Sequence, residues 1–118
     1  MTRFNTQLVH GLPVDDNDTG AVNPPIYNST TYAFERVDAM PRYDYARSGN
    51  PTRDFLERQI AQLEQGKRGF AFASGLAAIH AVLSTFKPGD RIVVGDNIYG
   101  GTYSQLNEFF TRWGLVVE

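Results

Sequence analysis

Short apolar runs alternate with helical patterns along the second half of this 118-residue chain, and this alternation constrains the fold more than any other feature. Apolar residues recur at helical spacing after Asn50-Pro51 and again within residues 77–86 and 102–113. We expect strands at residues 70–73, 91–95 and 115–118. Continuously apolar strands between helices are typical of parallel sheets with helices on their faces. The sequence therefore predicts an α/β fold with a mainly parallel sheet flanked by helices.

Residues 1–48 do not share this pattern. They contain Pro24-Pro25 and a Ser/Thr/Tyr-rich stretch at residues 27–32, and their only helical pattern is a short one at residues 4–9. Such a segment buries little surface alone, yet its aromatic residues favour packing on another chain over disorder. We predict an extended N-terminal arm for subunit contact at residues 1–48, followed by the first part of an α/β domain at residues 49–118.

Charge and composition exclude several function classes. Eleven Lys and Arg residues against 13 Asp and Glu residues give a net charge of -2 without a basic block, so we expect no nucleic-acid binding. The absence of cysteine excludes disulfides and thiolate chemistry. No apolar run reaches the roughly 20 residues that span a bilayer, so the sequence predicts a soluble, cytoplasmic protein without membrane contact.

No metal site is predicted. Residues 15–20 look superficially like a calcium loop, but no bidentate Glu stands at the closing position. His10 and His80 are the only histidines, and neither has neighbours typical of a metal ligand. We expect His80, which falls within a predicted helix, to be structural.

Ser74, Gly75 and Leu76 connect the first predicted strand to a helix. The first N–H groups of a helix have no intrahelical partner and lie at the positive end of the helix dipole, so they suit a phosphate. Ser74 is either the N-cap or a phosphate ligand, and Gly75 allows close approach of the backbone. For this motif alone, an ordinary capped turn is the alternative interpretation.

Tyr45, Arg47 and Tyr99 are further candidates. In an extended segment Tyr45 and Arg47 share one face, and a phenol beside a guanidinium suits phosphate, although a surface Arg beside a packed Tyr is the alternative. Tyr99 follows a predicted strand, at the edge where ligands of parallel α/β folds bind. There it either stacks on a planar ring and assists proton transfer or merely covers the sheet edge.

Three segments in this order closely resemble the Cys/Met-metabolism family of enzymes that depend on pyridoxal 5′-phosphate (PLP): residues 45–53 (YARSGNPTR), 72–78 (FASGLAA) and 99–102 (YGGT). The family includes cystathionine γ-synthase, cystathionine β- and γ-lyases, methionine γ-lyase and homoserine sulfhydrylases. The resemblance implies an aspartate-aminotransferase-like, fold type I PLP domain, incomplete in this chain. It also implies PLP as cofactor, a small sulfur amino acid as substrate, and a homotetramer that is a dimer of dimers with sites shared between subunits.

The resemblance also implies roles at matching positions. Gly75 and Leu76 would hold the cofactor phosphate through backbone N–H groups, and Tyr45 and Arg47 would reach it from the neighbouring subunit. Tyr99 would stack on the pyridine ring and assist proton transfer. Family members more often have Met at the position of Leu76, a change that a backbone contact tolerates.

Lys67 and Lys87 are the only lysines, and neither lies in a context like the family's Ser-x-Thr-Lys. In the family, the Schiff-base lysine, the acid facing the pyridine nitrogen and the Arg for the substrate carboxylate lie later than this chain extends. We therefore expect the N-terminal part of a carbon–sulfur enzyme of methionine and cysteine metabolism, inactive alone. A cystathionine β/γ-lyase of transsulfuration is favoured, and a cystathionine γ-synthase or homoserine sulfhydrylase is the alternative. A non-catalytic truncated fragment or assembly module is the alternative of another class.

Overall fold

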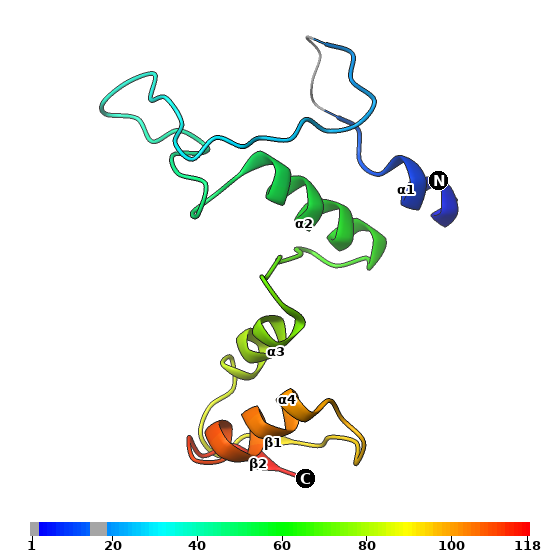
Figure 1. Cartoon of the computed structure of the whole chain (residues 1–118), viewed down its shortest axis with the longest axis vertical. Helices are drawn as coiled ribbons and strands as arrows, with labels where there is room; N and C mark the ends of the chain where they lie inside the picture. The colour runs from blue at the N-terminus through cyan, green and yellow to red at the C-terminus, as the bar shows by residue number, and fades with distance from the viewer. Residues whose placement is uncertain (1–2, 15–18) are drawn as a thin grey trace. The chain divides into compact units, whose positions relative to one another are not determined.

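The computed structural model describes residues 3–14 and 19–118, which form two compact units that meet in sequence between Ala71 and Phe72 (Figure 1). Most of the segment that looks like a calcium loop, residues 15–18, lies outside the described residues. Within the described parts of the chain, no helix is long and apolar enough to cross a membrane.

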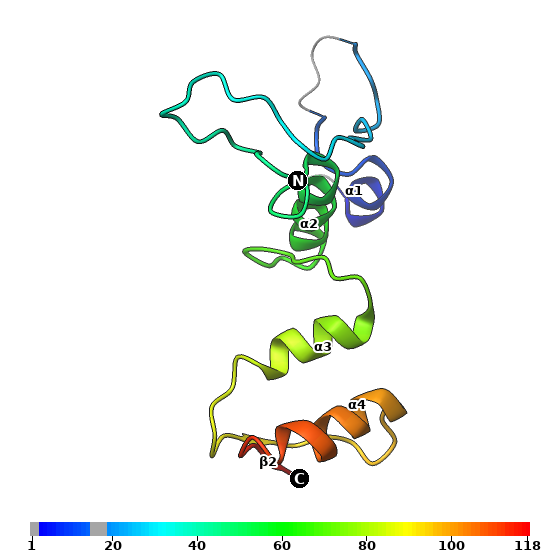
Figure 2. The same ribbon diagram turned by 60° about the vertical axis from the view of Figure 1, so that its left-hand side comes forward.

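The first unit contains helix α1 (Phe4–His10) and helix α2 (Pro51–Leu63), and the described residues between them, 11–14 and 19–50, have no regular helix or strand. The two helices are in contact, and both views show them side by side (Figures 1 and 2). Within these described residues, Thr31 and Tyr45 form an isolated antiparallel bridge. The predicted short helix near the N-terminus and the predicted helix after Asn50 are both confirmed.

Helix α2 begins by the signals that its sequence contains, whereas its end departs from the usual glycine stop. The Asn50 side chain accepts a hydrogen bond from the Thr52 N–H at 2.9 Å, and Pro51 occupies the first helical position. At the other end the Gly66 N–H donates to the Ala61 carbonyl at 2.8 Å. Gln65, rather than Gly66, takes the left-handed conformation at this stop, with φ 54°.

The second unit contains three helical segments and a two-stranded sheet: α3 (Gly75–Leu83), β1 (Arg91–Ile92), α4 (Gly100–Ser104), the π-helix η1 (Gln105–Phe110) and β2 (Val116–Val117). The strands are parallel, with Arg91 opposite Val116 and Ile92 opposite Val117. The Val94 N–H continues the ladder by donating to the Glu118 carbonyl at 2.7 Å. The predicted parallel pairing is therefore confirmed. The helix predicted before strand β1 is also confirmed and is α3.

The core of the second unit lies where α3, η1 and the sheet meet, and its buried members are Leu83, Leu106, Phe110 and Leu115. Phe110 and Leu106 are 0% and 1% exposed. The His80 ring packs 5.1 Å from the Phe110 ring, between centroids, which is the structural role expected of it. These contacts hold α3 and α4–η1 in one framework.

The predicted strand at residues 70–73 is wrong. This segment has no regular secondary structure, and Phe70 and Phe72 are 69% and 47% exposed. A strand needs a neighbour for its backbone groups, but the Ala71 N–H donates instead to the Glu57 carboxylate at 2.9 Å. The other two predicted strands form, each shortened to two residues.

Candidate functional site

The N-terminus of α3 has a free set of backbone donors. The Ser74 Oγ accepts from the Ala77 N–H at 3.1 Å, and the Ser74 carbonyl accepts from the Ala78 N–H at 3.1 Å. Ser74 is therefore the N-cap, and its hydroxyl hydrogen can still donate to a ligand. The N–H groups of Gly75 and Leu76 come before the first donor of the capped turn and have no acceptor within the helix. They are the groups that the family resemblance implies as ligands of the cofactor phosphate.

The space beside these donors fits an anion. A Cβ built on Gly75 meets no atom of the described residues within 4 Å, and Gly75 is exposed. Helix α3 has nine residues, so its dipole places positive potential in this space. An open, donor-lined helix end is what a phosphorylated cofactor requires, and this geometry therefore fits PLP.

Tyr99 lies next to the first turn of α3. It is the N-cap residue of α4 and is 72% exposed. A Cβ built on Gly101 would stand 2.7 Å from Tyr99 Cε1 and 3.1 Å from Leu76 Cδ2, so both side chains lie against this glycine. The structure thus brings together two predicted parts of the site, the α3 N-terminus and the exposed aromatic ring.

Replacement of Gly101 with alanine is expected to push the Tyr99 ring from this position. The added methyl group would overlap Tyr99 and crowd Leu76, whereas Gly100→Ala places a methyl group in open space one residue earlier. We expect Gly101→Ala to weaken PLP binding of the complete protein roughly fivefold, within the range of a modest packing change. Spectrophotometric titration with PLP measures this effect. Equal affinity of the Gly100→Ala and Gly101→Ala variants would contradict the placement of Tyr99.

The segment that contains Tyr45 and Arg47 is a turn, so the prediction of an extended segment is wrong. The Tyr45 carbonyl accepts from the N–H groups of Ser48 and Gly49, at 2.9 and 3.0 Å, and so closes a turn at residues 45–48. These hydrogen bonds exclude the alternation of an extended chain. The Arg47 guanidinium nevertheless lies over the Tyr45 ring, with Cζ 5.0 Å from the ring centroid. We call this segment the 45–48 turn.

The start of α2 holds the chain that leads to this turn, which the sequence did not reveal. Asp54 accepts hydrogen bonds from Arg42 Nη2 at 2.9 Å and from the Tyr43 hydroxyl at 3.0 Å. Burial raises the pKa of Tyr43, and its hydrogen bond to Asp54 raises this pKa further, so the hydroxyl stays protonated and donates. Asn50 donates to the Tyr27 carbonyl at 2.9 Å. The first turn of α2 is thus a junction for several parts of the arm.

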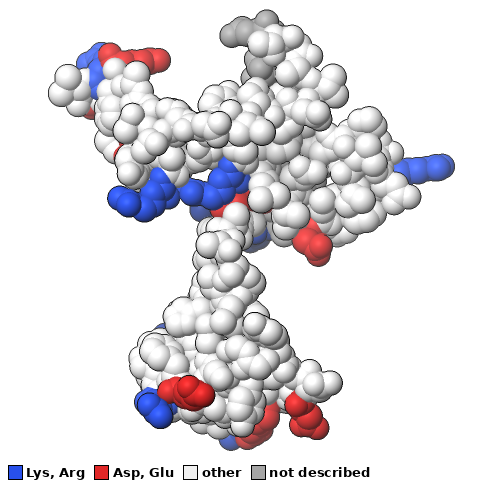
Figure 3. Space-filling view, viewed as in Figure 1, with Lys and Arg blue, Asp and Glu red and all other residues white. Residues whose placement is uncertain are grey.

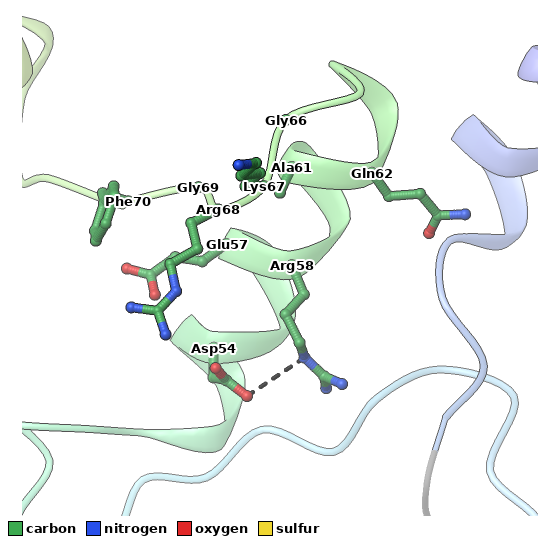
Figure 4. A pocket seen from close by; sticks show the side chains of 10 residues that line it. All are labelled: Asp54, Glu57, Arg58, Ala61, Gln62, Gly66, Lys67, Arg68, Gly69 and Phe70. Atoms are coloured by element: carbon green, nitrogen blue, oxygen red, sulfur yellow. Dashed lines mark ion pairs between the residues drawn. The ribbon is translucent and has the colours of Figure 1, made fainter.

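A groove of about 610 Å³ lies elsewhere in the first unit, between α2 and residues 66–70 (Figure 4). Acidic and basic side chains both line it, and the ion pair between Asp54 and Arg58, at 3.4 Å, lies on its wall. Its lining residues are Asp54, Glu57, Arg58, Ala61, Gln62, Gly66, Lys67, Arg68, Gly69 and Phe70. It contains none of the predicted site residues, and its mixed charge is poorly suited to a phosphate.

The predicted site residues are divided between the two units. Ser74, Gly75, Leu76 and Tyr99 belong to the second unit, where the contacts above bring them together, while Tyr45 and Arg47 belong to the first. Arg47 in the first unit and Ser74 and Gly75 in the second are exposed. The described residues contain no cluster of three His, Asp or Glu side chains that could hold a metal ion.

Comparison with known proteins gives a consistent family. The model of the family described as Cys/Met metabolism PLP-dependent enzyme matches residues 5–118. The chain is 48% identical to a cystathionine beta-lyase from Lactococcus lactis subsp. cremoris (strain MG1363), covering 100% of this chain and 31% of the relative. It is 44% identical over 100 residues to a cystathionine gamma-synthase/O-acetylhomoserine (thiol)-lyase from Bacillus subtilis (strain 168), covering 85% of this chain and 27% of the relative.

A solved structure supports the fold. The chain superposes with a TM-score of 0.87 on cystathionine gamma-lyase from Lactobacillus plantarum complexed with L-serine, at 44% identity. The match covers 99% of this chain and 30% of that structure. The predicted fold type I architecture is confirmed, and the chain spans about a third of the length of the relatives that it matches.

Proposed function

The chain belongs to the Cys/Met metabolism family of PLP-dependent enzymes, and we propose that the complete protein is a cytoplasmic cystathionine β- or γ-lyase. It would cleave a carbon–sulfur bond of cystathionine, a small sulfur amino acid. The observation that carries the proposal is the open N-terminus of α3 with Tyr99 beside it. The identity to a cystathionine beta-lyase supports the reaction class.

The N–H groups of Gly75 and Leu76, with the Ser74 hydroxyl, would hold the PLP phosphate. Bound PLP supplies an electron sink that stabilises negative charge at the substrate Cα. The chain's part of the work is to bind and orient: the α3 dipole favours the phosphate dianion, and fixed backbone donors set its position. Because Gly75 leaves open space at this end, the phosphate can approach the backbone closely.

Tyr99 would lie against the pyridine ring and help to move a proton at the substrate Cα. Tyr99 is 72% exposed, and its ring lies against Gly101, as does the Leu76 side chain at the start of α3. A phenol has the planar face for stacking and a hydroxyl that both donates and accepts. This position supports the proposed role.

Tyr45 and Arg47 would bind the same phosphate from a neighbouring subunit, in a dimer of dimers. Arg47 is exposed, and a guanidinium over a phenol ring forms a preorganised phosphate ligand. Residues 1–48 would be the arm that packs on the second copy. Large apolar side chains of this arm are exposed, including Val22, Ile26 and Met40 at 84%, 78% and 79%. The surface in Figure 3 is accordingly uncharged over wide areas.

A γ-replacement enzyme is the second candidate, because the chain is also 44% identical to a cystathionine gamma-synthase/O-acetylhomoserine (thiol)-lyase. In such an enzyme the same phosphate site would serve, and a thiol would replace the γ-substituent of a homoserine ester. The non-catalytic alternative applies to the isolated chain. Its two lysines are both exposed, and Lys67 lies just after α2 while Lys87 lies just before Pro88.

The experiment is an assay of the complete protein with PLP and L-cystathionine. We expect PLP to bind with a shifted absorbance band, and the substrate to give either homocysteine and pyruvate or cysteine and 2-oxobutyrate, each with ammonia. The products identify β- or γ-elimination. Turnover only with a homoserine ester and a thiol would support the second candidate. No PLP binding and no turnover would contradict both, and borohydride reduction with mass mapping would show whether Lys67 or Lys87 holds PLP in the isolated chain.

A further inference from the structure

We propose that Arg53 is a positioning residue, which holds the 45–48 turn in the shape that directs Arg47 toward the cofactor phosphate. The proposal rests on the proposed function, since it assigns Arg53 a role through the phosphate ligand Arg47. Arg53 lies in the first turn of α2, whereas Arg47 lies in the turn just before that helix.

The Arg53 guanidinium donates hydrogen bonds to three consecutive carbonyl groups of the turn. Nη1 donates to the Ala46 carbonyl at 3.3 Å. Nη2 donates to the carbonyls of Arg47 and Ser48, at 3.3 and 3.1 Å. A planar fork with five donors can satisfy three carbonyls that converge on one point, which a lysine ammonium on its flexible stem does less well. One side chain thus spans the turn that contains Arg47.

The location of Arg53 conflicts with the local preference of a helix. It is the third residue of α2, where the positive end of the helix dipole disfavours a cation. The convergent carbonyls offset this cost, because each directs partial negative charge at the guanidinium. A residue that breaks a local rule and gains specific contacts is expected to serve the wider structure.

Arg53 is itself anchored to the body of α2. Its Nε lies 3.8 Å from Glu57 Oε1, one turn further along the helix, and its side chain is 37% exposed. The same Glu57 oxygen accepts from the Ala71 N–H at 2.9 Å, and Figure 4 shows the Glu57 carboxylate projecting from α2. Arg53 therefore reaches the 45–48 turn from a part of α2 that is also held by the hydrogen bond between Glu57 and the Ala71 backbone.

Arg47 depends on the hydrogen bonds that Arg53 donates to the turn, because few contacts hold its own side chain. Within residues 3–14 and 19–118, its guanidinium contacts the Tyr45 ring and forms no hydrogen bond or ion pair. Its direction is thus set by the Tyr45 ring and by the backbone of the turn that carries both residues. Without Arg53 the charge of Arg47 would remain, but the turn would have to be ordered again when phosphate binds, which weakens binding.

The test is the affinity of the complete protein for PLP and for pyridoxal, which lacks the phosphate, measured by titration of the apoprotein. We expect Arg53→Ala to weaken PLP binding roughly tenfold and to leave pyridoxal binding unchanged. Because Arg53 acts through Arg47, the double variant Arg47→Ala/Arg53→Ala should bind PLP no more weakly than Arg47→Ala. Arg53→Lys should lose less affinity than Arg53→Ala. Arg58→Ala, in the same helix but paired with Asp54, is the matched control and should resemble the parent.

Several results would overturn the role of Arg53. These are a normal PLP affinity of Arg53→Ala, an equal loss for PLP and pyridoxal, or additive losses in the double variant. If Arg53→Ala does not fold, Arg53→Lys carries the test, and an unchanged PLP affinity of that variant would overturn the proposal. Failure of the proposed function appears separately, as a parent protein that binds PLP no more tightly than pyridoxal.

Discussion

Replacement of Arg47 with alanine is expected to weaken PLP binding of the complete protein by about a hundredfold. The exposed guanidinium offers charge-assisted, two-pronged hydrogen bonds to a phosphate, and these are among the strongest that a side chain makes. Alanine removes the charge and the donors while leaving the turn, which is closed by backbone hydrogen bonds of Tyr45 and by Arg53. Titration of the apoprotein with PLP measures the loss.

Arg36→Ala is the matched control for this substitution. Arg36 is also an exposed arginine of residues 1–48, but its guanidinium is paired with Asp38 at 2.7 Å. A general effect of lowering the positive charge of the arm would weaken PLP binding in both variants. We expect a loss in Arg47→Ala alone, and similar losses in both would contradict a specific phosphate ligand.

Replacement of Phe110 with alanine is expected to lower the free energy of unfolding by about 3–5 kcal/mol. Phe110 is fully buried and lies at the centre of the core of the second unit, with the His80 and Trp113 rings 5.1 and 6.0 Å away. Alanine would leave a cavity that the helix α3 and the sheet cannot close without moving. Because the same core supports α3 and α4, PLP binding should weaken along with stability.

Phe109→Ala provides the comparison, since Phe109 is the preceding residue and is 56% exposed. We expect it to cost about 1 kcal/mol. Urea unfolding of the complete protein, with hydrogen exchange of peptides from residues 105–117, reports both the overall loss and its location. Equal protection losses in the two variants would place the core of this unit elsewhere.

The parts of the fold that follow from local chemistry were predictable. Asn50 and Pro51 mark the start of α2 because capping and a fixed φ act within a few residues. Ser74 marks the start of α3 in the same way. The proposal that this helix end binds phosphate also rests on local backbone geometry, because unpaired N–H groups are a property of the helix start itself.

The features that depend on distant partners were not predictable in the same way. The apolar run at residues 70–73 resembles a buried strand, but the Glu57 carboxylate takes the backbone donor of Ala71. The 45–48 turn replaces the extended segment because its shape is held by Arg53, whose role was missed. The one available signal was the unfavourable charge of Arg53 at the start of a helix. Such a charge indicates that Arg53 makes a specific interaction, but it does not identify the partner.

The proposed cofactor site combines residues of two subunits, and complementation tests this claim most directly. Gly75→Asp would place a carboxylate at the phosphate position, in open space that does not disturb the fold and at a helix end that tolerates an acid. Neither Gly75→Asp nor Arg47→Ala should be active alone at a limiting PLP concentration. If the two residues act in one site from different subunits, each mixed dimer has one site that carries both substitutions and one that carries neither.

The deciding measurement is the cystathionine-cleaving activity of a mixture of the two variants, dissociated and reassembled at equal amounts. The account predicts recovery of about a quarter of the parent activity, because half of the dimers are mixed and each of these has one intact site of two. Activity no higher than that of either variant alone, in mixtures shown to contain mixed dimers, would contradict a phosphate site shared between subunits.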